Sequence, residues 1–343
     1  MHTLKLQTML ISWVIAAAWA GWASAQTPVR AQEQHPPQQS GLDQQGNPTM
    51  EAVNVLFRYS PELAIQIVRL RGTLIPVEGH TVASFNDAAS FEIGVEAAEI
   101  RVSSNQLTQL MNARVTRSPK AQVKDLRISV SGGQMLIDGT MKKGLHVPFH
   151  AVAGVGLTND YRVRIDVHQV HVVGVPVKGL LDALGLSMED LISQKGLKGM
   201  SVDGDSFLID PQTALPAPHI RARVAGVEVT GDGIVLRLGD GAPEMRTGEK
   251  GNYIAIRGGR IEYGRDEMFD SNLTMVDSTP RDPFEFYLND YWKQMVAASI
   301  KVTPDQGLRI RVPDYSKIGR SPGATEAAGE GAKREKLSGK GKA

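Results

Sequence analysis

Histidines are the side chains whose type and spacing come closest to a metal site. His146 and His150 are four residues apart in an alternating segment, so their side chains are expected on one face of a strand. His168 and His171 are three residues apart, which in a regular strand places them on opposite faces. A zinc site needs three or four converging ligands, and no HExxH-type spacing accompanies these residues. We therefore expect no metal, and interpret the histidines as surface or core side chains.

Carboxylates gather towards the C-terminal end of the chain, at Asp277, Asp282, Glu285 and Asp290. A glycosidase-type pair would have to face each other across a cleft, but Asp282 and Glu285 also have the spacing that stabilises the start of a helix. The chain has no Gly-x-Ser-x-Gly motif, and its lack of cysteine removes thiol nucleophiles. We predict a protein that is not an enzyme, with no catalytic residues and no cofactor. A carboxylate-dependent hydrolase is the least favoured alternative.

The strongest pattern in the chain is the alternation of apolar and polar residues that begins at residue 122. It predicts four strands joined by turns at 131–133, 142–144 and 158–160, then an apolar helix at 179–192 and one more strand at 200–209. Such alternation turns one face of an antiparallel sheet towards an apolar interior. We therefore expect an α+β fold, in which a mostly antiparallel, strongly curved sheet wraps one or two apolar helices.

The segments on either side add further expected elements. Strands are predicted at 65–77 and 90–102, followed by a capped helix at 104–111, and three more strands follow between 220 and 238. Beyond a polar break at 244–251, the pattern predicts a hairpin around Gly258–Gly259. Phe284, Tyr287, Leu288, Tyr291 and Met295 then have helical spacing, which predicts an amphipathic helix.

Several short motifs resemble a known family in their order. They are Leu136–Thr140, Val147–Phe149, Val173–Val177 with Gly179–Leu181, Met200–Val202, and Val227–Val229 with Ile234–Leu236. Over residues 120–240 the chain resembles the LmeA-like exported phospholipid-binding family, which is similar in turn to tubular lipid-binding (TULIP-like) domains. The resemblance implies a curved sheet around a long helix, an apolar groove between them, and a phospholipid or other lipid as the partner.

The alternation itself assigns the residues of the expected groove. The predicted apolar lining comprises Val147, Phe149, Val163, Ile165, Leu180, Leu181 and Leu184. Lys142 and Lys143, beside a turn, are predicted to contact a lipid headgroup. A filled core uses the same kinds of side chains as a groove, so a cell-envelope scaffold or adaptor with a packed interior remains the alternative. In that alternative, the helix from Phe284 to Met295 would be the surface for a protein partner.

The ends of the chain carry an expected export signal and two polar tails. Lys5, an apolar stretch at 9–22 and Ala23-Ser24-Ala25 predict a signal peptide cleaved before Gln26, and hence a periplasmic or secreted protein close to membranes. The predicted division is a signal peptide (1–25), a disordered Gln/Pro-rich linker (26–50), the lipid-binding-like domain (51–243), a C-terminal extension (244–315) and a disordered basic tail (316–343). The net charge of +1 argues against a nucleic-acid partner.

Overall fold

The computed structural model describes residues 46–61, 63–115, 123–143, 145–172, 175–177 and 198–318. The predicted signal peptide, most of the predicted linker, the apolar helix at 179–192 and residues 319–343 of the tail lie outside this part. The side chains at 113–115, 142–146, 175–177 and 202 are also outside the description.

The described chain is mostly β, with 59% strand and 12% helix, and its helices are few and short. Its strands form two sheets in which most neighbours are antiparallel, so the predicted antiparallel character is confirmed. The predicted strong curvature is not seen, because the described residues contain no strongly curled sheet.

The larger sheet has twelve strands, and its main path runs in the order β13-β14-β4-β2-β1-β15-β16-β19-β18. The short strands β12, β17 and β3 pair in parallel with β4, β1 and β15, respectively. In chain order the strands are β1 (Thr49–Arg58), β2 (Ala64–Pro76), β3 (Ala83–Ser84), β4 (Phe91–Ser103), β12 (His219–Arg221), β13 (Val224–Thr230), β14 (Gly233–Gly239), β15 (Tyr253–Tyr263), β16 (Asp266–Asp277), β17 (Phe284–Tyr287), β18 (Ser299–Val302) and β19 (Leu308–Val312). The sheet therefore takes strands from both sides of the predicted division at residue 243.

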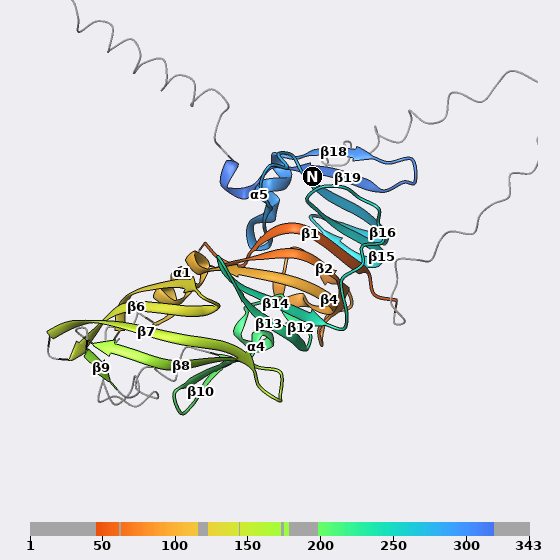
Figure 1. The fold of residues 1–343 in the computed structure, drawn as a ribbon. Helices are drawn as coiled ribbons and strands as arrows, with labels where there is room; N and C mark the ends of the chain where they lie inside the picture. Colours follow the sequence, from red (N-terminus) through yellow and green to blue (C-terminus); the bar gives the residue numbers. More distant parts are fainter. Residues whose placement is uncertain are drawn as a thin grey trace, which may run out of the picture. The chain divides into compact units, whose positions relative to one another are not determined.

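The smaller sheet has seven strands in the order β10-β11-β8-β7-β6-β5, with β9 beside β8, and all its pairings are antiparallel. Its strands are β5 (Val123–Ser131), β6 (Gln134–Lys143), β7 (Leu145–Leu157), β8 (Val163–Val172), β9 (Val175–Val177), β10 (Met200–Asp203) and β11 (Ser206–Ile209). The four strands predicted from the alternation are thus confirmed as a meander, β5 to β8, whose strands β6, β7 and β8 lie side by side in Figure 1. The single strand predicted at 200–209 is instead a hairpin, because Gly204 takes a φ of +57° between β10 and β11.

Helix α1 (Ser104–Val115) leads from the larger sheet to the meander and begins where it was predicted. Its start is a reciprocal capping box, in which the Gln106 N–H donates to Ser103 Oγ and the Ser103 N–H donates to Gln106 Oε1. The helix then lies against β5, the last strand of the smaller sheet. The helix therefore covers an edge that would otherwise be free in the described chain.

The predicted turn at Gly258–Gly259 is wrong, because β15 runs through both glycines. The chain reverses later, at Gly264 and Arg265, and β16 then pairs along the whole of β15. Both glycines have positive φ, +70° and +58°, and a Cβ on Gly259 would come within 2.5 Å of the Pro48 nitrogen. The glycines therefore form an irregularity inside a strand that passes close to the start of β1.

The predicted amphipathic helix from Phe284 to Met295 is also wrong over its first half. Residues Phe284–Tyr287 form β17, which pairs in parallel with the end of β1, and a 3₁₀ turn at Leu288–Asp290 leads into the six-residue helix α5 (Tyr291–Val296). The aromatic side chains of β17 are in the core, where Phe284 and Phe286 are fully buried. Pairing with β1 outweighs the local helical spacing of these residues.

The core of the larger sheet is built from side chains of nearly all its central strands. Among the fully buried ones are Leu70, Leu74, Ile256, Leu273, Met275 and Phe284. Within the described ranges, the remaining short helices are α4 (Pro211–Ala214) and the 3₁₀ turns η1 (Ala88–Ser90), η2 (Leu288–Asp290) and η3 (Tyr315–Lys317).

Candidate functional site

One face of the meander, here called the inner face, is apolar along its length. Its buried side chains are Val123, Leu126, Ile128, Met135, Met141, Phe149, Ala151, Ala153, Val167 and Val170. At the centre of this face β7 carries Ala151 and Ala153, which are opposite Ile137 and Met135 of β6. The inner face therefore has a floor of small side chains with larger apolar side chains around it.

Phe149 continues this face towards the start of β7. It is opposite Gly139 of β6, where a Cβ would come within 2.8 Å of the Phe149 ring. Gly139 thus leaves the space that the phenyl ring occupies.

The predicted lining residues do not all belong to this face. Phe149 is buried in the inner-face cluster, and Val147 and Ile165 are half-buried beside it. Val163 instead packs into the core of the larger sheet, because it is at the far end of the meander, opposite Leu157. The other predicted residues, Leu180, Leu181 and Leu184, lie outside the described chain, as do the side chains of Lys142 and Lys143.

A β-bulge in β8 decides which histidines share a face. Ala153 pairs with Val167 and Val152 pairs with Gln169, so His168 is the extra residue. The His168 Nε2 atom would be 2.7 Å from a Cβ on Gly154, which points to the outer face of the sheet. His168 and His171 are therefore on the same face, and the prediction of opposite faces is wrong because it assumed a regular strand.

On this outer face His150 and His171 are directly opposite each other on β7 and β8, with ring centroids 6.4 Å apart. The His150 Nδ1 atom is 2.8 Å from Asp138 Oδ1 on β6, and the Nδ1 atom of His171 has no hydrogen-bond partner in the described chain. This is a polar row across the sheet. It does not bring three ligand atoms close enough together to hold a metal ion within the described residues.

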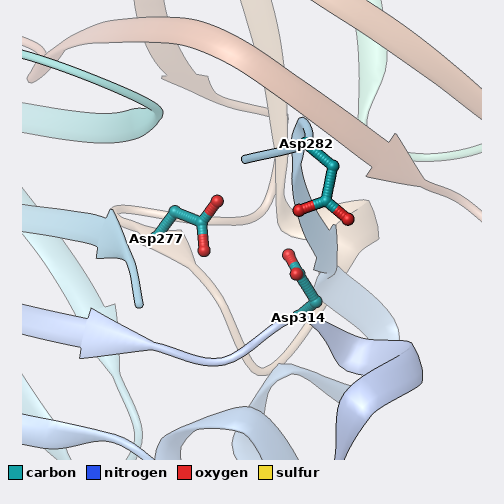
Figure 2. Close-up of side chains that lie close together, drawn as sticks. All are labelled: Asp277, Asp282 and Asp314. Carbon is teal, nitrogen blue, oxygen red and sulfur yellow. The ribbon is translucent and has the colours of Figure 1, made fainter. Parts of the chain in front are cut away.

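Three aspartates converge at the C-terminal end of the larger sheet, as Figure 2 shows. Asp277 ends β16, Asp282 precedes β17 and Asp314 follows β19, and each offers an oxygen within 4.8 Å of the others. Asp277 and Asp282 were singled out from the sequence, but Asp314 was not. No local signal could have found it, because only the pairing of β19 with β16 brings it close.

A lysine and several N–H donors surround these carboxylates and stabilise their negative charge. The Lys317 ammonium is 2.7 Å from Asp314 and 3.1 Å from Asp282, and its hydrogen bond to Asp314 raises the pKa of the ammonium. Asn252 donates to Asp277, and the backbone N–H of Glu285 donates to Asp314. These three oxygens are the donor set most suited to a hard cation in the described chain, but the lysine already supplies a positive charge there.

The other two predicted carboxylates are held separately. Glu285 accepts hydrogen bonds from Arg58 and from the backbone of Ser316. Asp290 accepts from the Tyr315 hydroxyl and from Lys293. The four carboxylates of the hydrolase alternative are therefore distributed over three environments.

A cavity of about 500 Å³ is lined by the turn that joins β7 to β8, by α4, and by β12 and β13. Its lining is largely charged and includes Asp160, Arg162, Asp210, Arg221 and Arg223. Tyr161 has a φ of +64° there, and its ring is 4.9 Å from the guanidinium carbon of Arg223. Such a lining suits a polar group rather than an acyl chain.

Comparison with known proteins gives no assignment: no family model matches the chain, and no curated protein or solved structure is significantly similar to it. The resemblance to the LmeA-like family therefore stays a prediction. Among the described residues, no helix is long and apolar enough to cross a membrane.

Proposed function

We propose that this protein is an exported, non-enzymatic lipid-binding protein that holds the apolar part of a lipid against the inner face of the meander. The observation that carries the proposal is the floor of that face, where Ala151 and Ala153 are surrounded by larger apolar side chains. Ala151 and Ala153 are buried in the structure, and we place the apolar chain of the lipid along these small side chains. Each methylene that leaves water for such a surface contributes roughly 0.8 kcal/mol.

We further propose that the predicted apolar helix at 179–192, which lies outside the described residues, forms the second wall of the groove. The sheet and this helix would then be arranged as in tubular lipid-binding domains, in a periplasmic protein. Leu180, Leu181 and Leu184 would line the groove, and Lys142 and Lys143 would contact the headgroup. The charged cavity near Arg221 takes no part in it.

The test is native mass spectrometry of the exported protein after gentle purification, followed by uptake of a fluorescent fatty acid. The parent chain is expected to carry phospholipid. The Ala153→Trp variant fills the floor and is expected to lose it, whereas Gln169→Trp, on the exposed outer face of β8, is expected to retain it.

Overpacking a tightly packed site destabilises a protein by roughly 1–3 kcal/mol, so urea unfolding is measured on each variant. Should Ala153→Trp fail to fold, the smaller change Ala151→Val is used, and weaker fatty-acid binding is expected. A parent chain that carries no lipid and takes none up would overturn the proposal and favour the scaffold with a packed interior.

The scaffold alternative, which uses the predicted helix from Phe284 to Met295 as a surface for a protein partner, has less support from the side chains of that stretch. Phe284, Leu288 and Tyr291 of the predicted aromatic stripe are buried in the core of the larger sheet. Among the large apolar side chains of residues 284–296, Trp292 and Val296, on the other side of α5, are strongly exposed.

A further inference from the structure

The large apolar side chains that are exposed on the described chain are concentrated in one segment. Six are strongly exposed, and four of them, Trp292, Val296, Ile300 and Val302, fall within residues 292–302; the other two are Tyr161 and Phe269. Single exposed apolar side chains are common on protein surfaces, but a group of them indicates an interaction site. We call residues 292–302 the apolar edge segment.

The backbone arranges these four side chains in two pairs. Trp292 and Val296 are four residues apart on α5 and so share one side of the helix. Ile300 and Val302 are two residues apart on β18 and share a face, opposite Ile310 and Leu308 of β19. β18 is the edge strand of the larger sheet in the described chain. Ile300 and Val302 therefore extend the apolar face of β19 past the buried core.

Positive charge accompanies the apolar side chains. Residues 291–304 contain Lys293 and Lys301 and no acidic residue. Lys293 pairs with Asp290, but Lys301 and the neighbouring Arg311 make no ion pair within the described part of the chain. Lys301 and Arg311 are on the face of the β18–β19 hairpin opposite to Ile300 and Val302, because Ser299 and Lys301, which pair with Arg311 and Arg309, alternate with those two residues along β18.

We propose that the apolar edge segment is a docking surface for a membrane that contains anionic phospholipid. An interfacial tryptophan with aliphatic neighbours enters the boundary of headgroups and acyl chains, while flanking cations attract anionic headgroups. A partner strand added to β18 would use Ile300 and Val302 but would leave the exposure of Trp292 and Val296 and the unpaired cations unexplained. A membrane that meets the outer edge of β18 contacts side chains from both faces of that strand, so it accounts for the apolar side chains and for the cations.

Co-sedimentation with vesicles tests this proposal, with phosphatidylcholine alone compared against phosphatidylcholine mixed with phosphatidylglycerol. The parent chain is expected to bind the mixed vesicles and to be released as salt screens the attraction. Trp292→Ser combined with Val296→Ser is expected to weaken binding roughly tenfold or more, through the lost apolar insertion. Lys301→Glu is expected to weaken it roughly thirtyfold, because it reverses one charge near the surface.

Phe269→Ser supplies the matched control, since Phe269 is an equally exposed aromatic residue on β16, outside the segment. Its vesicle binding should equal that of the parent chain. A parent chain that binds neither kind of vesicle, or an equal loss in Phe269→Ser, would overturn the proposal. A dimer in sedimentation velocity that Ile300→Lys dissociates, without vesicle binding, would assign the edge to a second copy instead.

This surface is separate from the proposed lipid site on the meander. Ala153→Trp is expected to bind the mixed vesicles as tightly as the parent chain does. Loss of internal lipid with retained vesicle binding, or the reverse, therefore shows which of the two proposals has failed.

Discussion

Glu285 is a buried carboxylate of β17 that connects this strand to β1 and to the 3₁₀ turn η3. Its Oε1 atom accepts hydrogen bonds from Arg58 Nε at 2.9 Å and Nη2 at 2.5 Å, and its Oε2 atom accepts one from the Ser316 N–H at 2.9 Å. The side chain of Glu285 is only 7% exposed, against 21% for Arg58. Burial alone would raise the pKa of the carboxyl, but the Ser316 and Arg58 donors outweigh it and hold the pKa below its usual range.

A group whose pKa is lowered in the folded state binds fewer protons there than in the unfolded chain. The stability that Glu285 contributes is thus complete above about pH 5 and is lost as the pH falls through the folded-state pKa. We expect Glu285→Gln to lower the free energy of unfolding at neutral pH by about 2 kcal/mol, because charged hydrogen bonds are lost. Urea unfolding across pH 2–7 should show a shallower acid loss in the variant.

Other carboxyls with lowered pKa, Glu249 and Asp290, keep part of the acid dependence in that variant. Glu78→Gln is the control, since Glu78 is exposed on a loop and its replacement should leave the profile unchanged. A Glu285→Gln profile parallel to that of the parent chain would contradict the assignment.

At the scale of elements, side chains of α1 form hydrogen bonds with the backbone of two residues on the edge of β5. The N–H of Ile128 donates to Thr108 Oγ1 at 2.8 Å, and the N–H of Leu126 donates to Asn112 Oδ1 at 3.0 Å. Asn112 Nδ2 also donates to the Leu126 carbonyl at 2.7 Å. The spacing of residues four apart on the helix thus equals the spacing of residues two apart on the strand. Helix side chains therefore bond to backbone groups that a neighbouring strand would otherwise pair with.

Removing this match is expected to loosen the edge of the meander. Asn112→Ala leaves the backbone groups of Leu126 without their partner, and a buried unpaired polar group costs roughly 1–3 kcal/mol. We expect a lower free energy of unfolding and faster amide exchange at Leu126. Gln109→Ala, on the exposed side of the same helix, should change neither measurement.

At the scale of the whole molecule, the strands of the smaller sheet form one insertion in the sequence between two strands of the larger sheet. The chain leaves β4, builds β5 to β11, and returns as β12, which pairs in parallel with β4. The last strands then complete the larger sheet, since β15 and β17 both pair with β1. The first strand is therefore held by strands formed some two hundred residues later.

This closure predicts the result of cutting the chain at the predicted division. A chain that ends at Pro243 would leave β1 without β15 and β17. It would also expose the part of the core that packs against Ile254 and Phe284. We expect it to aggregate or to unfold without a cooperative transition in urea, monitored by circular dichroism. A chain that ends at Ile318 keeps every described residue and should unfold like the parent chain; equal cooperativity in both would show that residues up to 243 fold alone.

Local sequence patterns were sufficient to predict many of the individual strands and helices. Alternation between turn residues located β5 to β8, and the capped-helix pattern at 104–111 located α1, because strand period, turn conformation and helix capping depend on residues close together in the chain.

The pairing of strands that are far apart in the chain could not be read from these local patterns. Phe284–Tyr287 has helical spacing but forms a strand, because β1 offers free backbone groups and a core for its aromatic side chains. Asp314 meets Asp277 only through the pairing of β19 with β16. The hydrophobic periodicity of a segment indicates whether it forms a helix or a strand, but not which distant strand it will pair with. Pairing between distant strands is therefore hard to predict from local sequence patterns.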